Sequence, residues 1–408
     1  MEPGIYVIKY LRTLLDWHII PRVKLRYQNP YKQEVLMANT INRPEVKFDW
    51  FIPIDGDGEH AGTRLAERPP SFDYLSQVAK TAEELGFYSL LIPTRFANGL
   101  FSEDQPLAET WTTATALAAV TKKIRFLVAV RPGFISLGLF AQMAAAFHQI
   151  SNGRLDINIV PGGIQNDFER LGEVSDHATR YQRAEEFIEA CRCLWGEPGP
   201  TYYEGEFYKL DGAYCSPSPA TDNTPKFYLG GVSERAMGLS ARQADVHLGW
   251  IEPLNDTANR LDSLKSYFSQ TQRDEFYGLR THLIVRDTEE EAWYAADQLI
   301  SNADPQVKAQ RRAAIEGTAM VGQQAQARQV ENHKLSQHLW NGLSEVRVNC
   351  GSALVGTPEQ VANQLLSYWK LGIDEFILSG FPHVEECHRT AEQVLPLLKK
   401  LISNSANS

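Results

Sequence analysis

Arg280 and His282 lie two residues apart in the segment LRTHLIVRD, which otherwise has the apolar composition of a buried strand. Because alternate residues of a strand face the same side, the guanidinium and the imidazole share one face. A fixed cation beside a titratable ring is suited to binding an oxyanion. The spacing is equally consistent with a salt bridge at a sheet rim and a core histidine with its own partners. The pair therefore marks a candidate anion site without deciding between these interpretations.

Arg347 is a second candidate cation, in the segment EVRVNCGSALVG at the end of a long insertion. An arginine in this place can reach the same pocket when the inserted segment closes over it. The alternative is an exposed surface arginine, and the position in the sequence alone favours that alternative.

These residues are positioned by an alternation of short apolar runs and longer amphipathic runs that begins at Val46. The alternation is typical of parallel strands joined by crossover helices. It predicts strands over 48–53, 88–94, 124–130, 154–160, 226–231, 245–250, 279–285 and 374–380. It predicts helices over 71–86, 109–121, 140–151, 180–195, 233–244, 257–270, 288–300 and 357–372, the last with Thr357 as N-cap and Pro358 at the first helical position.

Eight strand–helix units favour a single (β/α)8 TIM barrel of the α/β class over an open doubly wound sheet. An open sheet usually has fewer strands and an early glycine-rich phosphate loop, and no GxGxxG follows an early strand here. We expect the barrel to occupy residues 46–400. Two insertions, near 196–225 and 302–349, exceed the usual loop length, and the second is a candidate lid over the active face.

In such a barrel the chemistry lies where strands end and helices begin. The fifth strand ends in GGVSERA, where Gly231 and Ser233 precede a helix. Glycines let backbone amides approach an anion, and the helix dipole favours negative charge. A glycine turn with Ser233 as an ordinary N-cap explains the pattern equally well. The other candidate contacts near the ends of strands or at helix starts are Asp55, Thr94, Arg95, Asn158, Gly162, Arg180, Tyr181 and Trp250.

Three of these candidates have clear structural alternatives. Trp250 either walls a cofactor or plugs the top of the barrel, as aromatic residues commonly do. Arg180 and Tyr181 open a helix and could contact a phosphate, but a solvated helix start is the simpler interpretation.

The composition argues against several classes of partner and site. A formal net charge of −10 and a pI near 5.6 argue against nucleic acid or an anionic membrane as the main partner. Five scattered cysteines without a CxxC pair favour reduced thiols in a cytoplasm over a disulfide framework or structural zinc. Without GxSxG, HExxH or clustered metal ligands, a hydrolase or metalloenzyme is poorly supported, and we expect no metal.

The two ends of the chain are expected to lie outside the barrel. Residues 1–45 have no apolar run long enough for a signal peptide, and we expect an extension that is not part of the fold. Met37 precedes the polar segment ANTINRPEV and is a candidate physiological start in place of Met1. Residues 401–408 are predicted to form a disordered tail.

Several motifs follow one another in the order of the predicted strands: FDWFIPIDGDGEHAGT, LLIPT, FLVAVRPG, NIVPGG, DHATRY, YLGGVSERA, LGWIEP, LRTHLIVRDTEEEAW, SALVGTPEQVA and SGFPHVEE. With these motifs the chain resembles the bacterial luciferase-like flavin monooxygenases, and among them the two-component alkanesulfonate monooxygenases. The dimethyl sulfone monooxygenases come next. The resemblance runs from about Val46 to Leu398 and is specific in the combination of motifs.

The resemblance implies reduced FMN as cofactor, supplied by a separate NAD(P)H-dependent FMN reductase, and O2 as co-substrate. It implies cleavage of the C–S bond of an alkanesulfonate to an aldehyde and sulfite, in a homodimer or homotetramer. By the same resemblance Arg280 and Arg347 bind the sulfonate, and His282 orients the flavin adduct or exchanges protons with it. The implied flavin contacts are Asn158, Arg180, Tyr181 and Ser233.

The chain departs from the family at four positions, one of which is Pro161 in place of a hydroxyl residue near the flavin phosphate. Asp55 stands where the family has a histidine, Phe381 stands where it has the tyrosine of SGYPH, and no cysteine in TRFANGLFSED matches the family's active-site cysteine. Arg95 and Phe381 look more like the sulfone enzymes. A sulfone has no formal charge and does not need two arginines, so a sulfonate remains the preferred substrate. The alternatives are a sulfone or other organosulfur substrate, deazaflavin-dependent hydride transfer, and non-catalytic flavin binding.

Overall fold

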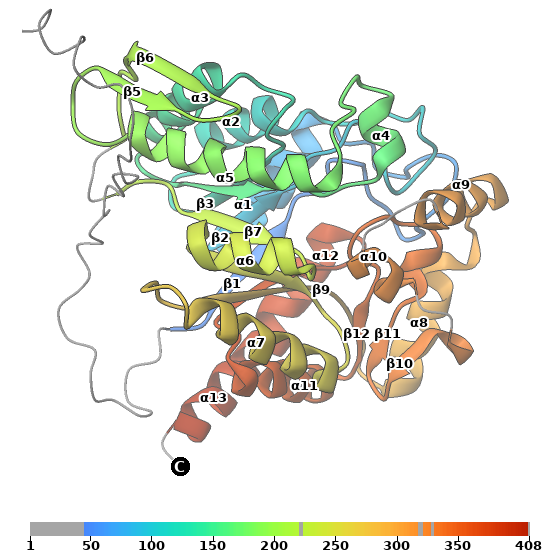
Figure 1. The fold of residues 1–408 in the computed structure, drawn as a ribbon. Coiled ribbons are helices and arrows are strands. Elements are labelled where there is room, and N and C mark those ends of the chain that lie inside the picture. The colour runs from blue at the N-terminus through green and yellow to red at the C-terminus, as the bar shows by residue number, and fades with distance from the viewer. Residues whose placement is uncertain (1–44, 220–222, 317–320, 328–329, 407–408) are drawn as a thin grey trace, which may run out of the picture. The chain divides into compact units, whose positions relative to one another are not determined.

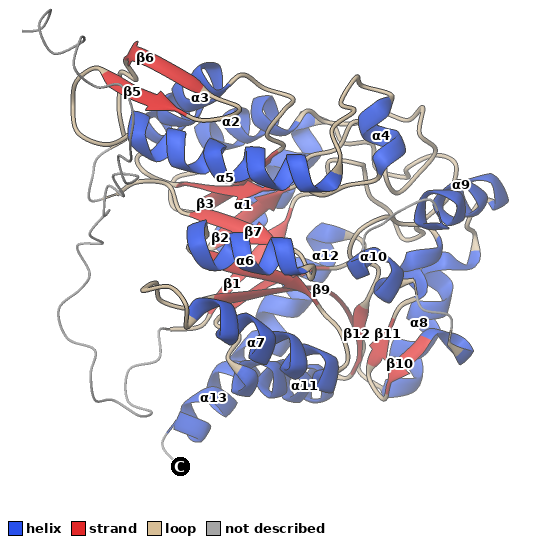
Figure 2. Cartoon of the chain, viewed as in Figure 1, coloured by secondary structure: helices blue, strands red, loops and turns tan. Residues whose placement is uncertain are grey.

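The computed structural model describes residues 45–219, 223–316, 321–327 and 330–406. In this part of the chain eight parallel strands close into a barrel in the order β9–β13–β1–β2–β3–β4–β7–β8, with β8 paired back onto β9. Helices alternate with the strands and cover the sheet (Figures 1 and 2). The predicted (β/α)8 TIM barrel is therefore confirmed. Its strands are β1 (Lys47–Phe51), β2 (Ser89–Ile92), β3 (Arg125–Val130), β4 (Leu155–Ile159), β7 (Phe227–Gly230), β8 (Val246–Trp250), β9 (Tyr277–Val285) and β13 (Glu375–Ser379).

The crossover helices pack their apolar sides on the outward-facing residues of the strands. The last of them begins at Pro358, and the side chains of Thr357 and Gln360 cap each other's backbone N–H groups, which confirms the predicted cap. Another begins at His177, earlier than predicted, because the Asp176 side chain caps its first turn. The helices are α1 (Phe72–Glu84), α2 (Thr110–Val120), α3 (Leu137–Ile150), α5 (His177–Leu194), α6 (Glu234–Gln243), α7 (Leu254–Phe268), α8 (Glu289–Ser301) and α11 (Pro358–Leu371).

Both predicted insertions contain secondary structure. Near 196–225 a two-stranded hairpin forms a sheet separate from the barrel, and within 302–349 helices and short strands gather beside α8 (Figure 1). The elements of the insertions are β5 (Thr201–Glu204), β6 (Lys209–Ala213), α9 (Pro305–Glu316), α10 (Val321–Gln326), η1 (Glu331–His333), β10 (Lys334–Ser336), β11 (Leu339–Trp340) and η2 (Gly342–Glu345). Outside them lie α4 (Gln165–Glu169), between β4 and α5, and β12 (Ala353–Gly356), which follows the second insertion.

Strand β9 belongs both to the closed barrel and to the branch of the same sheet that continues into the insertion. It spans nine residues, all of them buried. Its first part pairs with β8 and β13, whereas the residues from His282 to Val285 pair with β12, which in turn carries β11 and β10. The strand that holds Arg280 therefore also supports the small sheet built by the insertion at 302–349.

The C-terminal segment is helical through its last described residue. After β13 come α12 (His383–Arg389), the π-helical turn η3 (Thr390–Val394) and α13 (Leu395–Ala406). The sequence predicted a disordered tail from residue 401, but α13 continues because Leu401 and Ile402 pack against the main apolar core. Residues 1–44, with the candidate start Met37, lie outside the described residues.

None of the helices in the described ranges is long and apolar enough to cross a membrane.

The base of the barrel, at the amino ends of the strands, contains a buried pair of carboxyl groups. Asp49 on β1 is fully buried. Glu375 on β13 accepts a hydrogen bond from the Tyr228 hydroxyl at 3.2 Å and lies 3.6 Å from the Lys47 ammonium. Burial raises the pKa of Asp49 well above its usual range, and the negative charge of Glu375 raises it further. We therefore expect Asp49 to retain its proton near neutral pH.

Replacing Asp49 by asparagine should make the protein relatively more stable as the pH rises. A carboxyl group with a raised folded-state pKa contributes stability below its unfolded pKa of about 3.9 and loses that contribution as the pH rises through the folded pKa. Asparagine cannot ionise and still has N–H groups to donate. The gain in unfolding free energy of Asp49→Asn over the wild type should grow with pH by at most about 1.4 kcal/mol per unit, in urea titrations between about pH 5 and 9.

The matched control for this experiment is Asp297→Asn, at an exposed position of α8. A stability difference between Asp49→Asn and wild type that stays constant across the pH range would contradict the buried-proton interpretation.

Candidate active site

Arg280 lies within β9, level with Trp250 at the carboxyl end of β8. Its guanidinium carbon is 3.8 Å from the centroid of the Phe51 ring, and the residue is only 7% exposed. Its Nε and Nη2 atoms have no hydrogen-bond partner among the described residues. Buried donors without partners are rare in folded proteins, so these atoms indicate a site for a ligand that accepts hydrogen bonds.

Arg347 reaches the same ring from the inserted segment. It follows η2, where its backbone N–H donates to the carbonyl of Leu343 at 2.8 Å, and its guanidinium carbon lies 5.2 Å from the Phe51 centroid. Arg347 is 1% exposed, which excludes the alternative of a surface arginine. Its Nε and Nη2 atoms likewise have no partner in the described part of the chain. The structure thus brings two free guanidinium groups over one phenyl ring.

The two guanidinium groups are charged and mutually repelling. Burial lowers the pKa of Arg347 to about 9, and repulsion from Arg280 and Arg95 adds to this effect. Burial likewise lowers the pKa of Arg280 to about 10. The nearby carboxylate of Asp55 already accepts from Arg95 Nε at 2.9 Å and from the Gly99 amide at 2.6 Å. Three arginines therefore face one carboxylate, and an oxyanion placed beside Arg280 and Arg347 would relieve the excess positive charge.

His282 has hydrogen-bond partners inside the protein for both ring nitrogens. Nε2 lies 3.2 Å from the Cys350 carbonyl, and Nδ1 lies 2.8 Å from the Ser379 hydroxyl. A carbonyl only accepts, so Nε2 carries the proton and Nδ1 accepts from Ser379. Burial lowers the pKa of His282 well below its usual value, and the charges of the two arginines lower it further. His282 is therefore a neutral core histidine, whereas its neighbour Arg280 fits the anion interpretation.

Phe381 forms the wall between two histidines. Its ring stacks on His282 with centroids 5.5 Å apart and meets His383 edge-on at 5.0 Å. His383 is fully buried, and its Nδ1 lies 3.0 Å from the Asp57 carboxylate. Asp57 also accepts from the Tyr74 hydroxyl and, at 2.6 Å, from the His383 backbone N–H.

The Asp57–His383 pair was not among the residues predicted to form the site. Although burial raises the pKa of Asp57, its interactions with His383 outweigh burial and lower it. The carboxylate is thus held ionised beside the imidazole. The sequence carried a signal for this pair, since Asp57 follows the first strand and His383 follows the last, and these strands are neighbours in a closed barrel.

Gln326, at the end of α10, ties the insertion to the barrel. Its amide group donates to the Ile251 carbonyl at 2.8 Å and accepts from the Gly351 amide at 3.0 Å and the Ser352 hydroxyl at 2.9 Å. Its backbone carbonyl accepts from the Asn341 side chain at 3.0 Å. Gln326 is 2% exposed. A polar side chain buried with this set of partners holds α10 against the end of β8.

The same contacts position the anion site. The Ser352 carbonyl accepts from the His282 backbone N–H at 3.2 Å, and the Cys350 thiol lies 3.6 Å from the Arg280 carbonyl. Gln326 therefore fixes Gly351 and Ser352, in the segment that follows Arg347 and packs against β9. The predicted lid at 302–349 contacts the mouth of the barrel in this way.

Gly231, Ser233 and Tyr181 come together at the N-terminus of α6. Gly231 has φ +133°, and a Cβ there would lie 2.7 Å from the Ala236 side chain and 3.3 Å from the Tyr181 hydroxyl. Ser233 caps the helix and accepts from the Ala236 N–H at 3.3 Å. The rings of Tyr181 and His177 lie 4.6 Å apart. A partly exposed helix start with two hydroxyl groups and a close backbone fits a phosphate group such as that of FMN.

The other residues predicted to contact the cofactor differ in whether their side chains are available to a ligand. Asn158 is level with Tyr228, which lies in the barrel interior, so its partly exposed side chain faces inward. Thr94 and Trp250 are half-buried at strand ends. Arg180 is used internally: it donates to the carbonyls of Pro161 at 3.2 Å and Ser175 at 2.5 Å.

Gly162 also has an internal contact, because its carbonyl accepts from Arg131 at 2.5 Å. Within the described residues no group of three or more His, Cys, Asp or Glu side chains could hold a metal ion.

The closed parallel barrel, with buried guanidinium donors and a glycine-containing helix start at the carboxyl ends of its strands, defines a TIM-barrel protein with a candidate anion site at this end. The model of the luciferase-like monooxygenase family matches residues 46–375. The chain belongs to this family, and its membership indicates a flavin-dependent oxidoreductase.

Solved structures of three other proteins share the fold. A riboflavin lyase has 19% identity and a TM-score of 0.74, with 88% of this chain and 92% of that chain covered. EDTA monooxygenase from Chelativorans sp. BNC1 has 16% identity and a TM-score of 0.72, covering 88% and 94%. An F420-dependent secondary alcohol dehydrogenase has 15% identity and a TM-score of 0.61, covering 87% and 99%. At these identities the likeness concerns the fold.

Replacing Gln326 by leucine should loosen the segment behind Arg347. Leucine fills a similar volume but leaves the Gly351 amide and the Ser352 hydroxyl without their acceptor, at a cost of about 1–3 kcal/mol per buried group. Hydrogen exchange at the Gly351 amide should therefore become about 10- to 100-fold faster. Gln310→Leu, at an exposed position of α9, is the matched control. Unchanged exchange at Gly351 in Gln326→Leu would show that the glutamine does not hold this segment.

Proposed function

We propose that this protein is the oxygenase of a two-component system and uses reduced FMN and O2 to cleave the C–S bond of alkanesulfonates, giving an aldehyde and sulfite. The observation that carries the proposal is the pair of buried guanidinium groups of Arg280 and Arg347, stacked on Phe51 with donors that have no protein partner in the described structure. A sulfonate offers three acceptor oxygens in a tetrahedral arrangement, which suits two arginines approaching from different elements.

The chain's own residues would bind, orient and shield the substrate. Arg280 and Arg347 would hold the sulfonate oxygens, and the Phe51 ring would support both cations. Gln326 would keep α10 over the site and limit the entry of water. Bound FMN, reduced by a separate NAD(P)H-dependent reductase, would supply the oxygen chemistry. Gly231, Ser233 and Tyr181 would hold its phosphate, and Asn158 and Trp250 would lie beside the rest of the cofactor.

A sulfone substrate is the second candidate, and Phe381 favours it. The ring of Phe381 gives the pocket an apolar wall where a phenol would offer a proton, which suits an uncharged ligand. A sulfone, however, would not offset the positive charge of Arg280 and Arg347, and burying that charge without a partner is costly. We therefore place the sulfonate first.

One reconstitution separates these functions. Purified protein is mixed with FMN, a flavin reductase, NADPH and O2, and sulfite release is measured over matched series of alkanesulfonates and sulfones. Sulfite from sulfonates supports the proposal. Turnover of sulfones alone would transfer the function to that class, and hydride transfer with a deazaflavin in the absence of O2 would replace the monooxygenase. Flavin binding without turnover of any substrate would indicate a non-catalytic protein.

Arg280→Met and Arg347→Met should each weaken sulfonate binding by about 2–5 kcal/mol, because each removes one partner of a buried charge pair. The expected readout is a large increase in KM for sulfonates in the sulfite assay. Arg242→Met removes an arginine on the outer face of α6, paired with Glu185, and is the control. Near-normal KM values in both site variants would place the anion elsewhere.

Phe381→Tyr should change the pH dependence of sulfite release, because the phenol adds a titratable proton donor beside His282 and His383. The change is expected as an additional ionisation in the profile of kcat against pH. A profile that superimposes on that of the wild type would mean that position 381 takes no part in proton transfer.

A further inference from the structure

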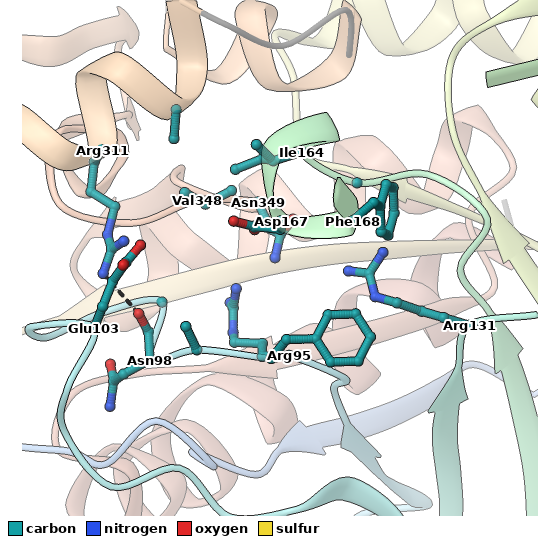
Figure 3. Close-up of a pocket in the computed structure, with 15 residues that line it drawn as sticks. Arg95, Asn98, Glu103, Arg131, Ile164, Asp167, Phe168, Arg311, Val348 and Asn349 are labelled. Atoms are coloured by element: carbon teal, nitrogen blue, oxygen red, sulfur yellow. Dashed lines mark hydrogen bonds between the residues drawn. The ribbon is translucent and has the colours of Figure 1, made fainter. Parts of the chain in front are cut away.

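A second group of arginines lies beside the proposed sulfonate site. Figure 3 shows a pocket lined by Arg95, Arg131 and Arg311, with Arg311 and Arg131 on opposite sides and Arg95 between them. Arg131 follows β3, and Arg311 descends from α9 of the insertion. The rings of Phe96 and Phe168 form part of the wall. The pocket thus combines cations with an apolar surface.

Arg131 and Arg311 each have a guanidinium nitrogen without a hydrogen-bond partner among the described residues. Arg131 uses one nitrogen for the Gly162 carbonyl, and its guanidinium lies over the rings of Phe96 and Phe168 at 5.5 and 5.1 Å. Arg311 is 4% exposed and donates through Nη2 to the carbonyls of Asn98 at 2.9 Å and Phe101 at 2.7 Å. The Nε atoms of Arg131 and Arg311 are buried and have no partner among the described residues.

The carboxylates in the same pocket do not cancel these charges. Glu103 forms an ion pair with Arg170 at 3.2 Å. Asp167 makes no close ion pair with either arginine in the described structure, and burial raises its pKa, with a further contribution from Glu103. The free positive charge at this end is therefore that of Arg131 and Arg311.

The pocket and the sulfonate site adjoin. Arg95 lines the pocket and also repels Arg280 and Arg347, as their lowered pKa values record. Asn349 lines the pocket two residues after Arg347, at most about 7 Å along the chain. The side-chain amide oxygen of Asn349 accepts from Arg95 Nη1 at 2.9 Å. The two anion-binding groups are thus separated by a short distance bridged by Arg95 and Asn349.

We propose that the pocket of Arg131 and Arg311 is a subsite for a second oxyanion on the substrate, and that the preferred substrates are sulfonates with a carboxylate or second sulfonate on a short hydrocarbon spacer. This inference rests on the proposed function, because it takes Arg280 and Arg347 as the site of the first sulfonate. The guanidinium groups of Arg131 and Arg311 bind the second oxyanion, and the Phe96 and Phe168 rings contact the spacer.

The flavin phosphate is the competing occupant of this pocket. The N-terminus of α6, with Gly231 and Ser233, already offers amides, a hydroxyl and a favourable dipole for a phosphate. The α6 site lies at the end of β7, whereas Arg131 follows β3 and Arg311 comes from the insertion. If the pocket held the flavin phosphate, substitution of Arg131 or Arg311 would lower the affinity for FMN. If it holds a second oxyanion of the substrate, the same substitutions lower the affinity for the doubly charged substrate.

The test compares ligands that differ only in the second charge. Isothermal titration of the full chain in the presence of FMN measures binding of 3-sulfopropanoate against propane-1-sulfonate, and of 4-sulfobutanoate against butane-1-sulfonate. The wild type should bind each sulfocarboxylate about 10- to 100-fold more tightly, as expected for a charge-assisted contact. In Arg131→Met and Arg311→Met this ratio should fall toward one, while the affinity for the alkanesulfonates changes little.

The ratio is measured within one protein, so a loss of folded fraction in a variant does not affect it. Arg311→Lys should restore part of the preference, and Arg242→Met should retain all of it. Equal affinities for the paired ligands in the wild type would overturn the inference. So would an equal loss of both ligands, or a loss of FMN affinity, in the Arg131 and Arg311 variants. Failure of the proposed function shows separately, as absence of sulfite from any sulfonate.

Discussion

The arrangement of residues at the carboxyl ends of the barrel strands depends on one constraint. This constraint is the repulsion between Arg280 and Arg347 above the Phe51 ring. Two like charges in a water-poor site repel strongly, and each also loses solvation. The fold tolerates them because the ring face of Phe51 attracts both cations and because neighbouring groups hold their backbones in place. A bound anion would offset the repulsion between the two guanidinium groups. Ligand binding should therefore stabilise the folded protein.

Two of the departures of this chain from its family, at Asp55 and at the missing cysteine, are explained by a single ion pair. Asp55 stands in the place of the family's histidine, and Arg95 lies in the segment that lacks the family's cysteine. The structure pairs them directly, with Arg95 Nε 2.9 Å from the Asp55 carboxylate. A buried carboxylate without a cation would be costly, and a third unpaired arginine would add to the repulsion at Arg280. Each residue therefore makes the other acceptable, and together they leave the combined positive charge of Arg280 and Arg347 unchanged.

The sequence could predict what depends on local periodicity. The strand–helix alternation identified the barrel, and the two-residue spacing placed Arg280 on the correct face of β9. The sequence could not show that Arg280 has free donors whereas His282 has its own hydrogen-bond partners. Those partners are Cys350 and Ser379, 68 and 97 residues away along the chain. The Asp57–His383 pair was missed for the same reason, since closure of the sheet brings its two members together. Helix α13 was missed because its apolar residues matter only against a core that the tail alone does not reveal.

The double use of β9 has an entropic consequence. A lid hung on flexible hinges would have to order its binding residues at the moment of ligand capture, and part of the binding free energy would be lost to that ordering. Here the segment after Arg347 leads directly into β12, which is hydrogen-bonded in register to the continuation of the strand that carries Arg280. Most of the conformational freedom of Arg347 is therefore given up when the chain folds. The relative placement of the two cations therefore behaves as a property of one continuous sheet and is set before a ligand arrives.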